Sequence, residues 1–427
     1  MVFAVLFLSF MVALAMALPI AWALGISSLG SLILLNVPLS TVPQKIFTGM
    51  DIFPLMCIPF FVMAGDIMAY GGLSKRLLGF AVAIVGSIRG GLACANVIAS
   101  MIFGGITGSA IADASALGPL TIDMMTKNGY DRTFSAALVS ASACIGPIIP
   151  PSIPVVVYAM AVSGVSIGGL FAAGILPGVM IGISLMSYSV YASKKRNFPK
   201  REERITPKQF LIAWRDAILA LLMPLIILGG IFSGVFTPTE AAAVSAVYAF
   251  VVSYFVYGEL KLSDLPEIFL SSAITTAVVM IIIGTANIFG MIVAFEQLGM
   301  KLERLISPLG HFGFILVVNI ILLWIGTFMD QNPAILILAP VFAPIAYHLG
   351  MSPIHFGFMM IMNLIIGLIT PPMGQVLFVV APIAKIPLDN LAKAIWPFVL
   401  AEVIVLLLVA YFPFFTVFIP ALLGYTH

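Results

Sequence analysis

Apolar residues in this chain come in long, nearly continuous runs, and residues 1–24 form the first of them. A helix needs about 20 mostly apolar residues to cross a bilayer, and runs of that length recur along the sequence. The composition agrees with this pattern, because 62% of the residues are hydrophobic and 8% are charged, too few charges to cover a water-facing surface. The pattern predicts an all-α protein that crosses a membrane several times.

Glycine, proline and small polar residues interrupt some of these runs, and the interruptions repeat. Shifting residues 105–155 forward by 221 positions brings six glycines and prolines onto glycines and prolines. A weaker match relates 61–78 to 289–306 at an offset of 228. Because the positions of glycine and proline are kept while the other side chains differ, the sequence indicates an old internal duplication. The matched pairs are Gly105/Gly326, Pro119/Pro340, Gly129/Gly350, Gly146/Gly367, Pro150/Pro371 and Pro151/Pro372.

The predicted fold is therefore an all-α membrane protein with two repeats, which we expect to be inverted. The first half covers 1–193 and the second covers 211–427, and a basic loop at 194–210 joins them. Each half is expected to begin with membrane spans and to continue with a helical hairpin and a broken helix. We expect the hairpins at about 90–126 and 311–348, and the broken helices at about 132–163 and 354–384.

Positive charge gathers around the central loop. Eight of the 19 lysines and arginines lie between 194 and 215, together with three acidic residues, so this stretch carries +5 and the rest of the chain −3. The positive-inside rule places such a loop in the cytoplasm. We expect no nucleic-acid partner, because the loop only joins two spans. The basic residues are Lys194, Lys195, Arg196, Lys200, Arg201, Arg204, Lys208 and Arg215.

Paired interruptions of this kind are typical of the binding sites of secondary transporters. Unwound backbone is tolerated inside a membrane only where it lines protein or a water-filled cavity. The ends of the half-helices then present carbonyl groups to a cation and N–H groups to an anion. The alternative is that the glycines allow close packing and the prolines only bend the helices. Four interruptions in register favour a binding site.

Four charged residues lie well inside apolar runs, where each costs about 2.5–3.5 kcal/mol on insertion. Asp330 is the most informative, because it follows the break at Gly326 and Thr327 and precedes a helix start at Pro333. Its carboxylate, a hydroxyl and freed carbonyls suit a hard monovalent cation such as Na⁺. Asp330 could instead cap the helix. The other three are Asp66, Asp113 and Glu402; Asp113 either caps a half-helix or pairs across the bundle, and Asp66 and Glu402 have no assigned role.

The two partner breaks contain a glycine followed by a proline pair, which removes two N–H donors and frees carbonyls of the preceding turn. These carbonyls lie near 146–149 and 367–370. Polar side chains at or near the breaks are candidates for substrate contact. They are Ser142, Ser152, Asn332, Asn363 and Gln375, and Thr370 adds a further hydroxyl.

Enzymatic functions find little support in the sequence. It contains no HExxH zinc motif and no Walker loop, so the chain cannot hydrolyse ATP itself and transport would depend on an ion gradient. A passive channel is an alternative, but it would need a continuous polar stripe. A membrane scaffold subunit without its own site would leave the paired breaks unexplained.

The stretches 103–118, 146–154, 229–249 and 363–375 closely resemble the large (M) membrane subunit of the tripartite ATP-independent periplasmic (TRAP) transporters, of the C4-dicarboxylate and sialic acid type. The resemblance implies a multi-pass protein of the bacterial inner membrane that imports a small organic acid with sodium. It implies two partners: a small four-span membrane subunit (Q type) and a periplasmic substrate-binding protein (P type). It also implies an elevator mechanism, in which a transport domain slides against a scaffold domain within the membrane lipid.

The resemblance also assigns ligands to Na⁺, with two or more coupling ions and the substrate between the hairpin tips. Import of a monoanion against the membrane potential needs at least two Na⁺ for the voltage to help, and a dianion needs three. The first sodium site would use Thr107, Gly108, Ser109, Gly146, Ile149 and Pro150. The second would use Gly326, Thr327, Asp330, Gly367, Thr370 and Met373.

Overall fold

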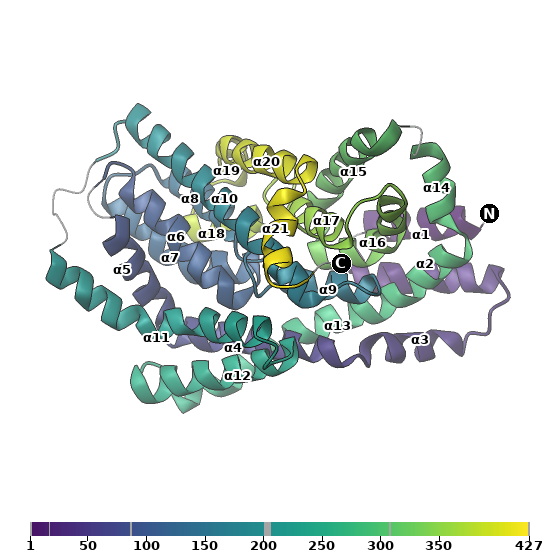
Figure 1. Cartoon of the computed structure of the whole chain (residues 1–427), viewed down its shortest axis with the longest axis horizontal. Coiled ribbons are helices and arrows are strands. Elements are labelled where there is room, and N and C mark those ends of the chain that lie inside the picture. Colours follow the sequence, from purple (N-terminus) through teal and green to yellow (C-terminus); the bar gives the residue numbers. More distant parts are fainter. Residues whose placement is uncertain (1, 17, 86–87, 200–205, 307–308, 426–427) are drawn as a thin grey trace.

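A computed structural model describes residues 2–16, 18–85, 88–199, 206–306 and 309–425, and the regular elements in these ranges are all helices (Figure 1). Lys200, Arg201 and Arg204 of the predicted basic loop lie outside the described residues. Five of the described helical segments are long and apolar enough to cross a membrane, and two bent helix pairs bring the number to seven if each pair is one span. The five are Phe53–Tyr70, Ile167–Lys195, Pro207–Phe232, Pro238–Val256 and Leu262–Phe295.

One group of helices comes from the start of each half. In this group α4 packs against α12 and α13, and α13 also packs against α2 and α3, so the two halves interleave (Figure 1). A hydrogen bond from Ser272 Oγ to Asp66 Oδ2 (2.8 Å) ties α13 to α4. The first-half members are α1 (Val2–Ala15), α2 (Ile20–Leu34), α3 (Thr41–Met50), η1 (Phe53–Met56), α4 (Cys57–Tyr70) and α5 (Leu73–Val85). The second-half members are α11 (Pro207–Phe232), α12 (Pro238–Val251), η2 (Val252–Val256), η3 (Leu262–Asp264), α13 (Leu265–Phe295) and α14 (Leu298–Ile306).

A second group contains two helix pairs from each half, and every pair is interrupted by a short non-helical segment. In the first half these helices are α6 (Gly91–Thr107), α7 (Ala110–Lys127), α8 (Arg132–Ala143) and α9 (Ile153–Ala161). In the second half they are α15 (Gly310–Gly326), α16 (Gln331–His348), α17 (Pro353–Gly367) and α18 (Gln375–Ala384). We call α6–α7 and α15–α16 the hairpins, and α8–α9 and α17–α18 the broken helices.

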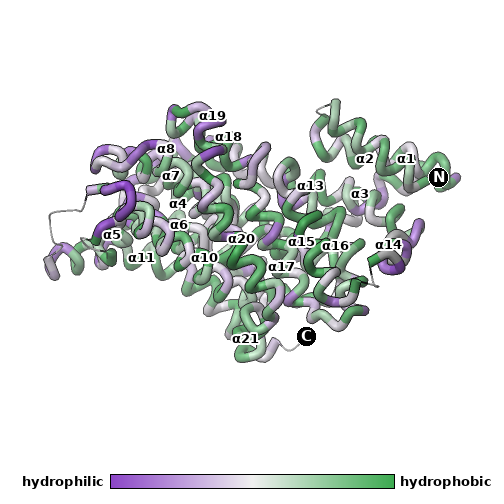
Figure 2. The backbone as a smooth tube through the Cα atoms, turned by 90° about the horizontal axis from the view of Figure 1, so that it is seen from above, coloured by the Kyte–Doolittle hydropathy of each residue, from purple (hydrophilic) through white to green (hydrophobic). Residues whose placement is uncertain are grey.

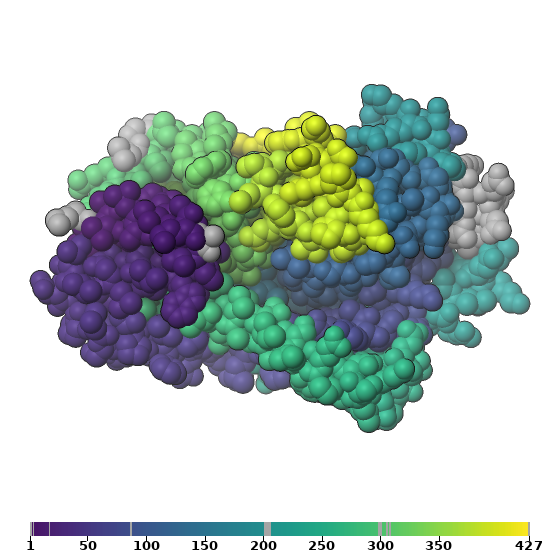
Figure 3. Space-filling model, turned by 180° about the vertical axis from the view of Figure 1, so that it is seen from behind, coloured from purple at the N-terminus to yellow at the C-terminus, as the bar shows by residue number. Residues whose placement is uncertain are grey.

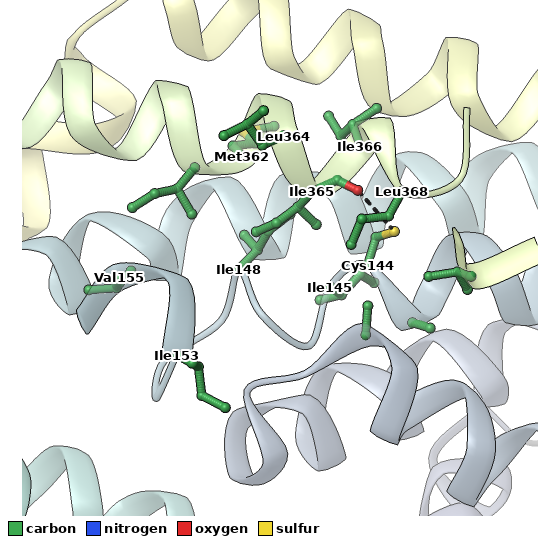
Figure 4. Close-up of a cluster of buried hydrophobic side chains, with 14 of the residues drawn as sticks. Cys144, Ile145, Ile148, Ile153, Val155, Met362, Leu364, Ile365, Ile366 and Leu368 are labelled. Atoms are coloured by element: carbon green, nitrogen blue, oxygen red, sulfur yellow. Dashed lines mark hydrogen bonds between the residues drawn. The ribbon is translucent and has the colours of Figure 1, made fainter. Parts of the chain in front are cut away.

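The two halves exchange contacts in a reciprocal way. Helix α9 of the first half packs against α16 of the second, and α18 of the second half packs against α7 of the first. Each of these contacts is the repeat-equivalent of the other, which is the property of an interface with two-fold symmetry. Cys144 Sγ lies 3.5 Å from the carbonyl oxygen of Ile365, its own equivalent 221 residues later (Figure 4). A residue contacts its equivalent only close to the symmetry axis, so a pseudo-two-fold axis passes between the two broken helices.

The remaining helices surround this central group. Helix α10 (Ile167–Lys195) packs against α6, α20 (Trp396–Tyr411) and α21 (Phe414–Leu422), and Figure 3 shows the C-terminal residues lying on first-half residues. The pair α18–α19 (Leu388–Ala394) bends by 116° and the pair α20–α21 by 64°. Hydrophilic residues gather around α5, α8 and α14, whereas the middles of the helices are mostly hydrophobic (Figure 2). Large apolar side chains such as Trp22, Phe47 and Leu225 are exposed, as expected of a surface that faces lipid.

Candidate functional site

The first hairpin turns at Gly108 and Ser109, between the end of α6 and the start of α7. Gly108 has a φ of +59°, and a Cβ atom there would lie 2.8 Å from the carbonyl oxygen of Pro151. Glycine is therefore required both by the left-handed backbone and by the neighbouring chain. Ser109 caps α7, because its side chain accepts a hydrogen bond from the backbone N–H of Ala112 at 3.4 Å.

The tip of this hairpin packs backbone to backbone on the first broken helix. A Cβ atom on Gly104 would lie 2.2 Å from the Cα of Gly146, and one on Gly105 would lie 3.3 Å from the carbonyl oxygen of Pro150. The structure thus brings together the residues expected to form the first sodium site.

The second half repeats this contact. A Cβ atom on Gly367 would lie 2.5 Å from the Cα of Gly326, and the N–H of Gly374 donates to the carbonyl oxygen of Thr327 at 2.9 Å. The residues expected to form the second sodium site therefore also lie together, at the tip of α15–α16 and the break of α17–α18. One detail differs between the halves. Gly146 is contacted by Gly104, whereas its equivalent Gly367 is contacted by Gly326, which corresponds to Gly105 at the repeat offset.

Each break leaves peptide oxygens available for a ligand. Helices α8 and α17 end at Ala143 and Gly367, and the peptide bonds Pro150–Pro151 and Pro371–Pro372 are cis. Among the residues that the structure describes, the carbonyl oxygens of Ile149, Pro150 and Thr370 accept no hydrogen bond. Where each hairpin tip contacts its broken helix, two helices end and two begin. The free carbonyl groups of helix C-termini and the free N–H groups of helix N-termini therefore lie in the same region.

The threonine hydroxyls at the hairpin tips and the helix breaks differ in their hydrogen bonds. Thr327 Oγ1 donates to the carbonyl of Trp324 and Thr370 Oγ1 to that of Ile366, both at 2.8 Å, so their lone pairs remain free. Thr107 is buried, and its hydroxyl has no hydrogen-bond partner among the described residues. A buried polar atom without a partner is rare, and a bound ligand is one explanation for it.

Asp330 sits where the second hairpin turns into α16. Its Oδ1 accepts a hydrogen bond from the N–H of Asn332 at 2.9 Å, so Asp330 caps α16, which was the alternative role read from the sequence. The Asp330 carboxylate also lies beside the side chain of Asn332. The cap fixes the position of this carboxylate at the hairpin tip, and its remaining lone pairs are available to a cation.

The five candidate substrate contacts fall into two groups. Asn332 and Gln375 are half-buried, beside Met373, which is 51% exposed. Ser142, Ser152 and Asn363 are buried. Ser152 caps α9, and its hydroxyl donates to the carbonyl of Pro147.

Ser142 and Asn363 hold helices together in this conformation. Asn96 Nδ2 donates to Ser142 Oγ at 2.7 Å and ties α6 to α8, while Asn363 Nδ2 donates to Asn319 Oδ1 at 2.6 Å and ties α17 to α15. Ser142 and Asn363 are repeat equivalents, so both halves place a polar pair between the first helix of the hairpin and the broken helix.

Asp113 differs from what the sequence suggests. It does not cap α7, because Ser109 does, and neither of its oxygens has a hydrogen-bond partner among the described residues. Asp113 is 1% exposed, and Glu402 on α20 is fully buried, with the same lack of partners within the described chain.

One stretch of the sequence bears on the argument against enzymes. Residues Gly164–Gly168 match the Gly-x-Ser-x-Gly pattern of serine hydrolases, in which the serine sits on a strand-to-helix turn. Here the Ser166 side chain accepts a hydrogen bond from the N–H of Gly169 at 3.1 Å and caps α10, in a turn between two helices. Its role is structural.

Taken together, interleaved helices, two tip-to-break contacts and buried polar atoms define a multi-pass membrane transport permease. The chain belongs to the DctM component family of the tripartite ATP-independent periplasmic transporters, which it matches over residues 7–415. It is therefore a transporter permease of the bacterial TRAP type and not an enzyme.

Characterised relatives cover nearly the whole chain. It is 42% identical to the sialic acid TRAP transporter large permease SiaM of Vibrio cholerae, over 96% of each protein. It is 39% identical to the C4-dicarboxylate TRAP transporter large permease DctM of Rhodobacter capsulatus, over 95% of this chain and 96% of that protein. It is 40% identical to the isethionate TRAP transporter permease DctMQ of Oleidesulfovibrio alaskensis, of which it covers 65% while 96% of this chain is matched.

Structural comparison supports the fold. The MtrF antimetabolite efflux pump of Neisseria gonorrhoeae has a TM-score of 0.61 to this chain at 13% identity, covering 87% of this chain and 83% of that one. At this identity the likeness shows a shared fold only.

Proposed function

We propose that this protein imports a small organic acid, sialic acid or a C4-dicarboxylate, by coupling its transport to the sodium gradient. The observation that carries the proposal is the pair of equivalent tip-to-break contacts. Each contact holds glycine backbone against glycine backbone and gathers carbonyl and hydroxyl oxygens that accept no hydrogen bond from the described residues. Oxygen atoms of this kind are the ligands that Na⁺ prefers, and a duplicated site binds two ions.

The substrate carboxylate would lie between the two tips. Helices α7, α9, α16 and α18 all begin at the breaks, and the N-terminus of a helix attracts anions through its free N–H groups. Asn332 and Gln375 are the predicted side chains that reach a partly exposed surface there. Two Na⁺ with one monoanion would move one net positive charge inward, worth about 2.3 kcal/mol per 100 mV of membrane potential.

The proposed movement is of the elevator type. The reciprocal packing of α9 on α16 and α18 on α7 joins both hairpins and both broken helices into one block, the transport domain. Helices α2, α3, α4, α12 and α13 pack together into a second block, the scaffold domain. Sliding the first block against the second would carry both ion sites and the substrate together. In this arrangement the two repeats have inverted topology.

Two further components would complete the transporter. A small four-span membrane subunit of the Q type would pack on the scaffold domain within the lipid, and the fused DctMQ relative supports such a neighbour. A periplasmic substrate-binding protein of the P type would deliver the organic acid, as the family's tripartite description suggests.

Reconstitution tests the proposal. The chain and its two companion components are incorporated into proteoliposomes, and uptake of labelled sialic acid or succinate is measured in Na⁺ or choline buffer. We expect uptake only with an inward Na⁺ gradient, and faster uptake when the interior is made negative. Equal uptake in choline, or flux that only equilibrates the substrate, would refute sodium coupling and favour a passive channel.

A further inference from the structure

Four buried polar side chains form a cluster between α6, α7 and α8. Asn96 and Ser100 lie one turn apart on α6, and both donate to Ser142 Oγ on α8, at 2.7 and 3.3 Å. Asp113 on α7 lies beside Ser100. All four are at most 2% exposed. The two sodium sites proposed above use none of these side chains.

The cluster is rich in oxygen atoms that lack partners. Both carboxylate oxygens of Asp113 and the amide oxygen of Asn96 form no hydrogen bond with the described residues. Ser100 Oγ donates to Ser142 Oγ at 3.3 Å, and the same oxygen lies beside the Asp113 carboxyl group. None of the ion pairs found in the described chain includes Asp113. A buried ionised carboxylate without a counter-ion costs several kcal/mol, so Asp113 is either protonated, as Glu402 would be, or paired with a cation, and the oxygen atoms around Asp113 favour the cation.

We infer that Asp113 anchors a third Na⁺ site, with Ser100 and Asn96 as neutral oxygen ligands and Ser142 holding both of them in place. The inference rests on the proposed sodium coupling and adds an ion to it. A single carboxylate with neutral oxygens suits a monovalent cation, and no group of three metal-binding side chains occurs in the described parts of the chain.

The site belongs to the first half only. At the repeat offset of 221, Asp113 corresponds to Ala334 and Ser100 to Ile321. The hydrogen bond between Asn96 and Ser142 has a counterpart in the second half, between Asn363 and Asn319. The second half thus keeps the polar pair between helices and lacks the carboxylate. The inference therefore predicts three sodium ions for the whole chain.

A third ion has a consequence for the substrate. Two Na⁺ balance a dianion and leave no net charge for the voltage to act on. Three Na⁺ would move one net positive charge with each dianion, so the membrane potential would drive import at about 2.3 kcal/mol per 100 mV. The third site thus suits a doubly charged organic acid.

Counting bound ions on the purified chain tests the inference directly. Binding of radiolabelled Na⁺ is measured at equilibrium in detergent, with choline replacing Na⁺ outside the titration. We expect three saturable ions in the unmodified protein and two in Asp113→Asn, which keeps the size of the side chain. Ser100→Ala should keep three ions, with the affinity of one lowered several-fold.

Glu402→Gln is the matched control, because Glu402 is also a fully buried carboxyl without a partner in the described chain but lies outside the cluster. It should bind three ions. Two ions in both the unmodified protein and Asp113→Asn would overturn the third site and leave two-ion coupling intact, whereas no bound Na⁺ at all would overturn the proposed function itself. If Asp113→Asn does not fold, an unchanged affinity for every ion in Ser100→Ala also overturns the inference.

Discussion

The contact between Gly104 and Gly146 offers a direct test of how the first ion site is built. In Gly104→Ala the new methyl group would lie 2.2 Å from Gly146 Cα and 2.9 Å from Gly146 N. Carbon atoms in contact prefer about 3.5–4.0 Å, so the two backbones must separate by more than about 1 Å. Both contacted atoms belong to the backbone, and no side-chain rotation can relieve the clash.

The cost can be estimated from these distances. Overpacking by one methyl group typically costs about 1–3 kcal/mol, and replacing glycine by alanine in a helix returns about 0.5–1 kcal/mol. The two ranges leave a net loss of up to about 2.5 kcal/mol, and the short distances to backbone atoms place Gly104→Ala toward the upper end. Since the hairpin tip moves away from the break, the first sodium site should also lose affinity, by about tenfold for each 1.4 kcal/mol of binding energy.

Thermal unfolding of the purified protein, with and without saturating NaCl, measures both effects. A ligand that binds only the folded state raises the Tm, so the rise caused by Na⁺ reports on the ion sites. Gly104→Ala should have a lower Tm in choline, and NaCl should raise this Tm by less than it raises that of the unmodified protein. Gly79→Ala on α5 is the matched control, because no atom lies within 4 Å of its new methyl group, and it should keep the full response. An unchanged Tm and an unchanged Na⁺ response in Gly104→Ala would refute the proposed geometry.

Three further substitutions separate ligands from structural residues. Asp330→Asn should abolish sodium-driven uptake while expression stays normal, and unchanged uptake would limit Asp330 to its capping role. Ser109→Ala should weaken the apparent Na⁺ affinity in uptake assays only moderately, because backbone carbonyls remain, and should lower stability by about 0.5–2 kcal/mol through the lost cap; an unaltered Na⁺ affinity would exclude its hydroxyl as a ligand. Asn363→Leu should lower the Tm, since the buried Asn319 loses its partner at a cost of about 1–3 kcal/mol, and leave the KM for substrate unchanged in the folded fraction. A raised KM would instead make Asn363 a substrate contact.

Local signals in the sequence located the interruptions of the helices. Glycine and proline act on the backbone at their own positions, so their repetition at a fixed offset placed the breaks around Gly108, Gly146 and Gly367 without knowledge of the packing. The capping role of Asp330 could be read in the same way, because a carboxylate shortly before a proline at a helix start is a local pattern.

Packing between distant helices could not be read from the sequence. A serine or asparagine near a break can face either the substrate or a neighbouring helix, and only the tertiary structure shows that Ser142 and Asn363 face Asn96 and Asn319. For the same reason, the sequence could not show that the Asp113 carboxyl group lacks a hydrogen-bond partner among the described residues. Its position after the break suggested a cap, but Ser109 already occupies that role, and the burial of Asp113 comes from helices packed on α7, among them α6, α8 and α18.

The reciprocal exchange between the halves has a consequence for biosynthesis. Cys144 contacts Ile365 although 221 residues separate them. Helix α7 packs against α18, which is synthesised near the end of translation. Each ion site is built from one half alone, but the faces of α7 and α9 that pack on α18 and α16 stay uncovered until the second half has been made. A fragment truncated before α16 therefore contains every residue of the first tip-to-break contact but leaves α7 and α9 without their partner helices, so apolar faces meant for protein would meet lipid or other chains instead.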